Sequence, residues 1–167
     1  MIRQCVQTDF DSICSIINDA AMKYKGIIPA ACWHEPYMSA EQLTKDIAAG
    51  VEFYCYEDNG KPAGVMGLQH FPDVTLIRHA YVLSAAQGKG IGGKLLTSLL
   101  AKTDKPVLIG TWRDTPWSIA FYEKHGFKAL SKEELLPLLG KYWDVSDMHR
   151  ENSVVLADKK WYDNMRS

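Results

Sequence analysis

The sequence has little of what marks a membrane, secreted or nucleic-acid-binding protein. None of its apolar runs approaches the length that spans a bilayer, and its first residues lack the apolar core of a secretory signal. Its 19 basic and 20 acidic side chains give a formal net charge of -1, which provides no general attraction to nucleic acid or anionic lipid. We therefore expect a cytoplasmic protein that has neither nucleic acid nor a membrane as its partner.

The sequence also lacks any recognisable cysteine motif. No pair among its four cysteines has the close spacing of a zinc site or a redox centre, so we expect free thiols and no metal ion. Repeats, low-complexity tracts and linkers are absent too. The 167 residues are therefore predicted to form a single domain, residues 1–167, and 47% apolar residues suffice for a sizeable core.

What the sequence does contain is a regular succession of strand and helix patterns. Strands are predicted where β-branched and aromatic residues cluster or alternate, and helices where apolar residues recur every three or four positions. The predicted strands cover residues 1–6, 51–56, 62–70, 74–83, 107–112, 127–130 and 153–157. Helices are predicted to begin near Thr8, at capping boxes opened by Ser39 and Ser131, after the glycines at 88–93, and at an N-cap on Thr115.

This order of elements predicts an α/β fold. Strands 51–56, 62–70 and 74–83 form an antiparallel meander, because short turn signals separate them. Strand 107–112 has a helix on each side and is expected to run parallel to the strand before the glycines. The expected architecture is a mixed, mostly antiparallel sheet with a central parallel β–α–β crossover and helices on both faces.

The most informative stretch is residues 87–93, which follow a strand and open a helix. Glycines lack the Cβ atoms that would keep a ligand from the main chain. The first turn of a helix offers unpaired N–H groups and the positive end of the helix dipole, which together suit a phosphate. The candidate anion-binding residues are Gln87, Gly88, Lys89, Gly90, Ile91, Gly92 and Gly93.

Two nucleotide-binding interpretations fit this stretch poorly. Gly88, Gly90 and Gly93 have the spacing of the dinucleotide fingerprint, but that motif normally follows the first strand and needs an acid about twenty residues on. Here the loop follows a meander, and the next strand ends with Gly110-Thr111-Trp112 and has no acid at its end before Asp114. Nor is the stretch a Walker loop, because its Gly-Lys pair lacks the Ser or Thr that should follow.

A better match is to a known family. Residues 80–92, Ala-Tyr-Val-Leu-Ser-Ala-Ala-Gln-Gly-Lys-Gly-Ile-Gly, resemble the acyl-CoA loop of the GNAT superfamily of N-acetyltransferases. Residues 120–127, Ala-Phe-Tyr-Glu-Lys-His-Gly-Phe, resemble the second motif of that family. One departure is Trp117, which stands where many members carry an asparagine.

The resemblance implies an acyltransferase that uses acetyl-CoA as co-substrate and needs no metal. It assigns the pyrophosphate to residues 87–93. It also implies main-chain pairing of the pantetheine arm with Tyr81, Val82 and Leu83. Tyr122 matches the tyrosine near the thioester sulfur and is expected to protonate the leaving thiolate; alternatively, it is only a core aromatic.

The general base is predicted from residue chemistry. His79 lies on the strand that leads into the glycine loop, and an imidazole titrates near neutral pH. Strand alternation places it on the same face as Tyr81. His34 and Glu35 are alternatives, and a base acting through ordered water is compatible with all three.

The acceptor site is predicted in the loop of residues 27–38, where two prolines interrupt regular structure. Trp33, His34, Glu35 and Tyr37, and less directly Glu52, suggest aromatic walls and a carboxylate, which suit an amine. Trp33 and Tyr37 could equally fill the core. The acceptor is therefore expected to be a small-molecule or peptide amine.

Two classes of function remain open from the sequence. The first is an N-acetyltransferase that acts by direct attack in a ternary complex, because neither family motif holds a cysteine that could carry the acetyl group. The alternative is a non-catalytic CoA-binding sensor or a protein-interaction module. Trp143, Trp161 and Tyr162 could also supply an aromatic surface for a homodimer, or they could equally cover their own core.

Overall fold

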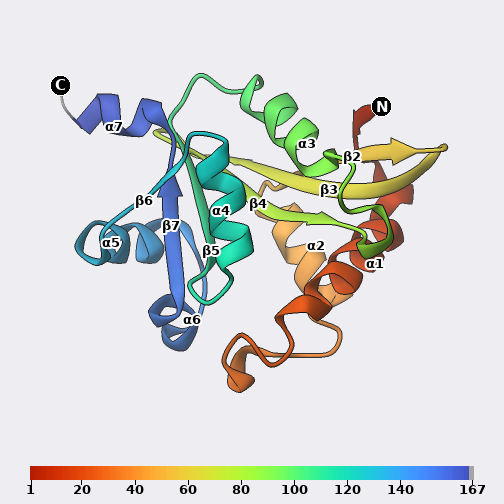
Figure 1. Cartoon of the computed structure of the whole chain (residues 1–167), viewed down its shortest axis with the longest axis horizontal. Coiled ribbons are helices and arrows are strands. Elements are labelled where there is room, and N and C mark those ends of the chain that lie inside the picture. The colour runs from red at the N-terminus through yellow and green to blue at the C-terminus, as the bar shows by residue number, and fades with distance from the viewer. Residues whose placement is uncertain (166–167) are drawn as a thin grey trace. The chain divides into compact units, whose positions relative to one another are not determined.

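The computed structural model describes residues 1–165 (Figure 1). The chain divides into two compact units. The first unit comprises Met1–Lys23 and His34–Asp104, and the second comprises Tyr24–Trp33 and the chain from Lys105 onward. Each unit is described by itself below. The single domain expected for residues 1–167 stays a prediction.

The first unit contains a four-stranded antiparallel sheet in the order β1-β2-β3-β4. The meander predicted from the sequence is confirmed. Its elements are β1 (Ile2–Gln4), η1 (Gln7–Asp9), α1 (Phe10–Ala21), α2 (Ala40–Ala48), β2 (Glu52–Asp58), β3 (Lys61–His70), β4 (Thr75–Val82), η4 (Ser84–Ala86) and α3 (Ile91–Leu100); η2 (Met22–Tyr24) runs from the first unit into the second.

The helices of the first unit lie on the two faces of this sheet (Figure 1). Val65 is fully buried in the cluster formed with α1 and α2, which includes Ile17 and Leu43. Its neighbour Gly64 points the other way, toward Ile91 of α3. Because successive strand residues face opposite sides, α3 covers the face that α1 and α2 do not.

A bulge interrupts the pairing of β3 with β4. Val65 pairs with Tyr81 but Gly67 pairs with Arg78, so His79 and Ala80 together oppose the single Met66. His79 has a φ of 54°, a left-handed conformation that is uncommon outside glycine. A Cβ on Gly67 would lie 2.9 Å from the carbonyl oxygen of Arg78 and 2.7 Å from Val51 Cγ1, so the bulge depends on this glycine.

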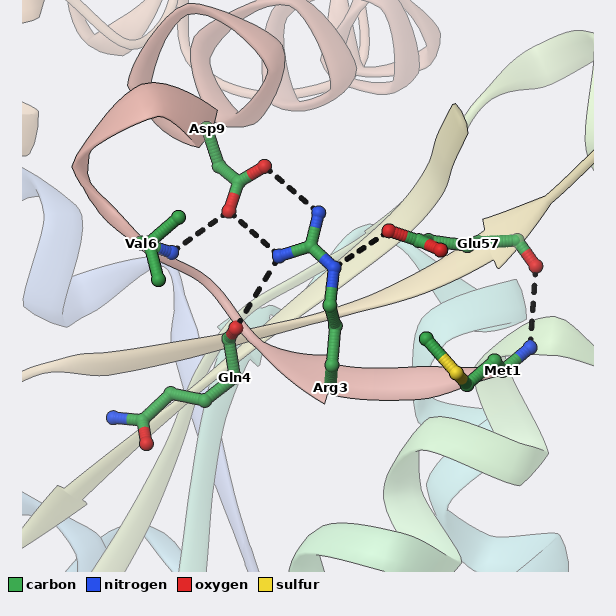
Figure 2. Close-up of polar contacts among 6 residues, drawn as sticks. All are labelled: Met1, Arg3, Gln4, Val6, Asp9 and Glu57. Atoms are coloured by element: carbon green, nitrogen blue, oxygen red, sulfur yellow. Dashed lines mark hydrogen bonds and ion pairs between the residues drawn. The ribbon is translucent and has the colours of Figure 1, made fainter. Parts of the chain in front are cut away.

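An arginine clamp fastens the N-terminal strand (Figure 2). The Arg3 guanidinium donates to both oxygens of Asp9, at 2.8 and 3.0 Å, and its Nε donates to Glu57 on β2. Asp9 also accepts a hydrogen bond from the Val6 N–H at 2.7 Å. The hydrogen bond from Arg3 holds the pKa of Asp9 below its usual value, although burial opposes this.

Only part of the predicted capping at α2 is present. Ser39 Oγ accepts a hydrogen bond from the Gln42 N–H at 3.0 Å, as expected. The Gln42 side chain does not close a capping box, because its amide donates to Asp46 Oδ1 at 3.0 Å. This departure links the helix start to a buried acid that the sequence analysis did not single out.

In the second unit, β7 pairs antiparallel with both β5 and β6. Its elements are η3 (Ala30–Cys32), β5 (Val107–Trp112), α4 (Pro116–Lys124), β6 (Lys128–Ala129), α5 (Lys132–Tyr142), α6 (Asp147–Glu151), β7 (Ser153–Ala157) and α7 (Lys159–Met165). Helices α6 and α7 were not predicted, because each is short and has no clear apolar periodicity.

Two helix starts in this unit test the predicted caps. Ser131 and Glu134 form the expected capping box, with bonds of 3.2 and 3.1 Å. Thr115 occupies the N-cap position of α4, but its hydroxyl donates to the Trp112 carbonyl at 2.8 Å and caps nothing. Gly126 has the predicted left-handed φ, at 91°.

The aromatic surface suggested for a homodimer is smaller than expected. Trp143 is only 8% exposed and packs against Gly110, where an added Cβ would lie 3.2 Å from the indole. Its place in the core agrees with the alternative that this residue covers its own core. Tyr162 donates from its hydroxyl to the Lys128 carbonyl at 3.0 Å. Homodimer formation stays a prediction.

Candidate active site

The glycine loop joins the end of β4 to the start of α3. Gly88 and Gly90 have φ angles of 84° and 75°, which cost other residues roughly 1–2 kcal/mol. A Cβ at either position would meet no atom within 4 Å, so the loop is open and glycine is needed there for its backbone conformation. Gly90 is the N-cap of α3, and the first turn of that helix contains no acid.

The first turn of α3 has the chemistry of an anion site. Ile91 is 2% exposed and anchors the turn against Gly64, while Gly92 and Gly93 add no bulk. The N–H groups of a first helical turn have no partner within the helix and lie at the positive end of its dipole. These residues can therefore accept a phosphate of a ligand without rearrangement of the helix.

Side chains of the loop are tied back to the sheet. The Gln87 amide donates to the Val82 carbonyl at 3.3 Å, and Lys89 Nζ lies 3.2 Å from Asp58 Oδ2 in an exposed ion pair. The N–H of Leu83 donates to the Ala63 carbonyl at 2.9 Å. The Leu83 N–H is thus already used within the sheet, and main-chain pairing of residues 81–83 with a ligand stays a prediction.

The bulge on β4 presents His79 to an acid on α2. His79 Nε2 lies 2.8 Å from Asp46 Oδ2, and the side chains are 16% and 8% exposed. The other oxygen of Asp46 accepts the hydrogen bond from Gln42. The imidazole also stacks on the Phe53 ring, with centroids 5.8 Å apart. These contacts fix the position of the ring on the face that α1 and α2 cover.

The pairing determines which ring nitrogen can accept a proton. A carboxylate only accepts hydrogen bonds, so in the neutral imidazole Nε2 carries the hydrogen and Nδ1 carries the lone pair. Among residues 1–165, His79 Nδ1 has no hydrogen-bond partner. The arrangement resembles other imidazole–carboxylate pairs in which the acid fixes the tautomer and stabilises the protonated ring.

Burial and neighbouring charges set the proton affinities of this pair. Burial lowers the pKa of His79 below its ordinary value, the hydrogen bond from Asp46 opposes this, and the charge of Arg78 adds to the lowering. For Asp46, burial works to raise the pKa, but the hydrogen bonds and charges from His79, Arg78 and Gln42 hold it below normal. At neutral pH the imidazole is therefore neutral and the carboxylate is charged.

Arg78 lies beside this pair and is half-buried. Its Nη1 donates to Gln69 Oε1 at 3.1 Å, and the Gln69 amide donates to the Ala49 carbonyl at 3.1 Å. Burial lowers the pKa of Arg78, and the charge of Asp46 opposes that effect. A cation, a base and an acid thus converge at the bulge.

The predicted acceptor loop is not drawn into this cluster. His34 and Glu35 are exposed, and Tyr37 packs against the apolar core of the first unit. None of the three forms a hydrogen bond or ion pair with His79. Trp33 is half-buried and belongs to the second unit. The roles of these four residues stay predictions.

Glu52 lies on the wrong face to join the His79 cluster. Burial raises the pKa of the neighbouring Tyr54 phenol and Glu52 raises it further, and the Tyr54 ring lies 4.9 Å from Lys102 Nζ, just after α3. The intervening Phe53 points to the opposite face and stacks on His79. Glu52 therefore does not join the His79 cluster, and its place in the acceptor pocket stays a prediction.

Tyr122 belongs to the second unit. It lies on α4, is 6% exposed, and makes edge contacts with the rings of Phe121 and Phe127. Burial raises the pKa of its phenol, and the neighbouring Tyr24 raises it further. Tyr24 stacks on Trp117 with centroids 6.5 Å apart. The phenol therefore remains protonated at neutral pH, as a proton donor requires.

Among residues 1–165, no group of three or more His, Cys, Asp or Glu side chains is placed to hold a metal ion. No helix in that range is both long enough and apolar enough to cross a membrane.

The sequence profile described as "Acetyltransferase (GNAT) domain" matches residues 18–135. The match covers most of the chain, and the protein belongs to the GNAT acetyltransferase family. The family resemblance inferred from residues 80–92 and 120–127 is confirmed.

Individual relatives agree with this assignment. "Putative acetyltransferase YjbC" of Bacillus subtilis (strain 168) is 27% identical over 128 residues, and the match spans 67% of this chain but only 65% of that protein. The PaiA N-acetyltransferase of Thermoplasma acidophilum, solved with coenzyme A, has a TM-score of 0.72 at 18% identity, covering 95% of this chain and 98% of its own.

A larger enzyme contains the same fold. N-acetylglutamate synthase of Neisseria gonorrhoeae, solved with coenzyme A and N-acetyl-glutamate, has a TM-score of 0.69 at 23% identity, covering 96% of this chain and 35% of its own. At these identities the structures demonstrate the fold alone. The predicted α/β class, with its mixed, mostly antiparallel sheet, is confirmed.

Sequence reasoning missed Asp46 and Arg78. A signal for Asp46 was available, because it lies three residues after the fully buried Leu43 and so on the apolar face of α2. A charge on such a face needs a partner. The partner, His79, is 33 residues away, and no local pattern links the two.

Proposed function

We propose that this protein transfers an acetyl group from acetyl-CoA to an amine by direct attack in a ternary complex. The observation that carries the proposal is the layout of one continuous segment. It runs from the paired His79, along β4, to the glycine turn at the start of α3. A base and an anion site would thus lie on the same strand–turn–helix of the first unit.

The glycine loop is suited to hold the donor. The N–H groups of residues 88–93 and the α3 dipole would bind the pyrophosphate of coenzyme A. Tyr81 and Val82 would pair with its pantetheine arm. The open space beside Gly88 and Gly90 is consistent with close approach of a ligand to the backbone. Coenzyme A in the structure of the similar PaiA enzyme supports this assignment.

His79 would act as the general base. An amine acceptor arrives largely as ammonium, and neutral His79 can take its proton at Nδ1. Asp46 then stabilises the imidazolium through the 2.8 Å contact at Nε2. The freed nitrogen lone pair forms the C–N bond to the acetyl carbonyl as the C–S bond breaks.

Tyr122 would return a proton to the departing thiolate. Its buried phenol stays protonated at neutral pH and can donate to the sulfur as negative charge develops there. Neither residues 80–92 nor residues 120–127 include a cysteine, which favours direct transfer over an acetylated enzyme. The acceptor is a small-molecule or peptide amine, and residues 33–37 are candidates to contact it. We place the reaction in the cytoplasm.

Thermal unfolding with and without acetyl-CoA tests donor binding. A ligand present at a hundred times its Kd adds about 2.7 kcal/mol to the free energy of unfolding, so the melting temperature should rise by several degrees. An unchanged melting temperature at millimolar acetyl-CoA would contradict the proposal. Release of free thiol with a panel of amines then measures turnover.

Tyr122→Phe separates catalysis from binding. It should lower kcat by about tenfold or more while the acetyl-CoA-dependent thermal shift is retained. Unchanged kcat would remove Tyr122 as the acid. Tight acetyl-CoA binding with no turnover on any amine class would favour a non-catalytic CoA-binding sensor or interaction module instead.

A further inference from the structure

We propose that Arg78 binds a carboxylate of the acetyl acceptor, so that the substrate is an amine carrying a nearby carboxylate, of which an α-amino acid is the simplest. The inference rests on the proposed function, because it gives the acceptor side of the same site. It concerns a residue that neither motif of the family includes.

Arg78 is a cation to which no anion among the described residues is directly bound. Its guanidinium makes one hydrogen bond, from Nη1 to the neutral amide oxygen of Gln69 at 3.1 Å. Within residues 1–165 it forms no ion pair with a carboxylate. A guanidinium has five N–H donors in a planar fork, so most of the donors of Arg78 remain available.

The nearest acid is already engaged. Asp46 influences Arg78 through its charge, but each oxygen of Asp46 has another partner: Oδ2 lies against His79 and Oδ1 accepts from Gln42. Neutralising Arg78 directly would require breaking one of these bonds. The charge is thus balanced at a distance, and its hydrogen-bonding capacity is left unused.

The unused donors are not sealed inside the protein. Fully buried side-chain nitrogens without a hydrogen bond occur in the second unit, at Arg150 Nε and Trp161 Nε1, but not at Arg78. Arg78 is half-buried, so a ligand can reach its fork while solvent competes weakly. Such a guanidinium matches the two oxygens of a carboxylate in a paired geometry.

The position beside the base defines how the substrate is oriented. Arg78 and His79 are consecutive residues at the bulge, and both lie close enough to Asp46 to feel its charge. In this proposal the amine gives its proton to His79 Nδ1, and a group a few bonds away meets the Arg78 fork. A carboxylate there is attracted, whereas a second ammonium, as in a diamine, is repelled.

The experiment compares amino acids with their decarboxylated amines. The pairs are phenylalanine and phenethylamine, leucine and isopentylamine, histidine and histamine, and lysine and cadaverine. Acetyl transfer is measured by thiol release at pH 8, above the ordinary pKa of an imidazole. Acceptor binding is measured separately by calorimetry with coenzyme A present, so that the result does not depend on turnover.

In the wild-type protein, at least one amino acid should exceed its decarboxylated partner by tenfold or more in kcat/KM and in affinity. Arg78→Gln should raise KM for that amino acid roughly 10- to 100-fold and change KM for the matching amine less than about threefold. KM for acetyl-CoA should not change. Arg78→Lys should recover part of the loss, because it restores the charge but not the fork.

Lys45→Gln is the matched control, since it removes an exposed cation next to Asp46 in sequence. It should change KM for neither the amino acid nor the matching amine. Equal losses for both members of a pair in Arg78→Gln would show a structural role and overturn the inference. So would preference for the decarboxylated amine in all four pairs, or binding of no amino acid. Turnover of amines without that preference would leave the acetyltransferase function intact, whereas absence of acetyl-CoA binding would remove the function itself.

Discussion

Two arginines of the first unit make opposite use of the same chemistry. Arg3 donates to Asp9 and to Glu57, and Asp9 also accepts from the Val6 N–H (Figure 2). Arg78 donates one hydrogen bond, to the neutral amide of Gln69, and the charge of Asp46 acts on both Arg78 and His79. The first cluster satisfies its groups internally. The second leaves a lone pair on His79 and the donors of Arg78 unused.

The difference distinguishes a structural ion cluster from a candidate site. Internal satisfaction stabilises the fold, because every desolvated group regains a hydrogen bond. Unused capacity beside a backbone bulge contributes little to stability and is available to a ligand. Substitutions in the two clusters should therefore separate cleanly, with losses of activity at one and losses of stability at the other.

The largest effect is expected for His79→Gln. Glutamine can still donate a hydrogen bond to Asp46 but cannot take a proton from the acceptor. We expect kcat to fall by roughly 10²–10³, within the range of general-base contributions. The acetyl-CoA-dependent thermal shift should remain, as measured by scanning calorimetry. A variant that keeps more than half of the wild-type kcat would show that the base lies elsewhere.

Asp46→Asn should have the next largest effect, with kcat/KM lower by about 10- to 100-fold, as for carboxylate partners of other functional imidazoles. In the wild type, kcat/KM should fall as the pH drops through the pKa of His79, because only the neutral ring accepts a proton. Asp46 raises that pKa and Arg78 lowers it, so the variant's acid limb should move to lower pH. A purely structural role for Asp46 would lower activity without moving the limb.

Arg3→Met should test the other cluster through stability. Losing the guanidinium leaves Asp9 buried, and we expect the free energy of unfolding to fall by about 2 kcal/mol. Activity per folded molecule should not change. Denaturant titrations and thiol release measure the two quantities, and a selective loss of activity would blur the proposed distinction.

The same variant should alter the pH dependence of stability. Asp9 has a lowered pKa in the folded protein. Its contribution is therefore present above the unfolded pKa of about 3.9 and is lost as the pH falls through the folded value. Arg3→Met should flatten this acid-side loss in denaturant titrations.

The smallest effect is expected for Lys45→Gln. Its ion pair with Glu41 spans 3.5 Å, and the side chains are 68% and 81% exposed. Exposed pairs of this kind contribute at most about 0.5 kcal/mol, so neither stability nor activity should change measurably. A large effect would mean that any charge near α2 affects stability or activity. The contrast between the Arg3 and Arg78 clusters would then not be specific to them.

Most of the fold could be predicted, because its signals are local. Alternating apolar residues and the Asp58-Asn59-Gly60 turn place β2 and β3, and Ser131 with Glu134 marks the start of α5. The glycine loop was located for the same reason. Short helices such as α6 were not predicted, since they have too few residues to show apolar periodicity.

The site was predictable only in outline. His79 could be chosen for its residue type and its strand, but strand alternation ignores the bulge, which makes its φ positive. Its pairing with Asp46 depends on how α2 packs on the sheet. Arg78 can be recognised as a candidate ligand-binding residue only from the structure, which shows that no carboxylate of residues 1–165 is directly bound to it. These features belong to tertiary contacts, which sequence patterns at short range do not encode.

Gly67 has no side chain to offer a substrate, yet it governs where His79 stands. A methyl group there would collide with the Arg78 carbonyl and with Val51, so larger residues would push β4 away from β3 or straighten the bulge. In a saturation library selected for activity, position 67 should therefore tolerate as few replacements as a catalytic residue. A search for variants of higher activity would therefore gain more from substitutions around the bulge than from substitutions of Gly67 itself.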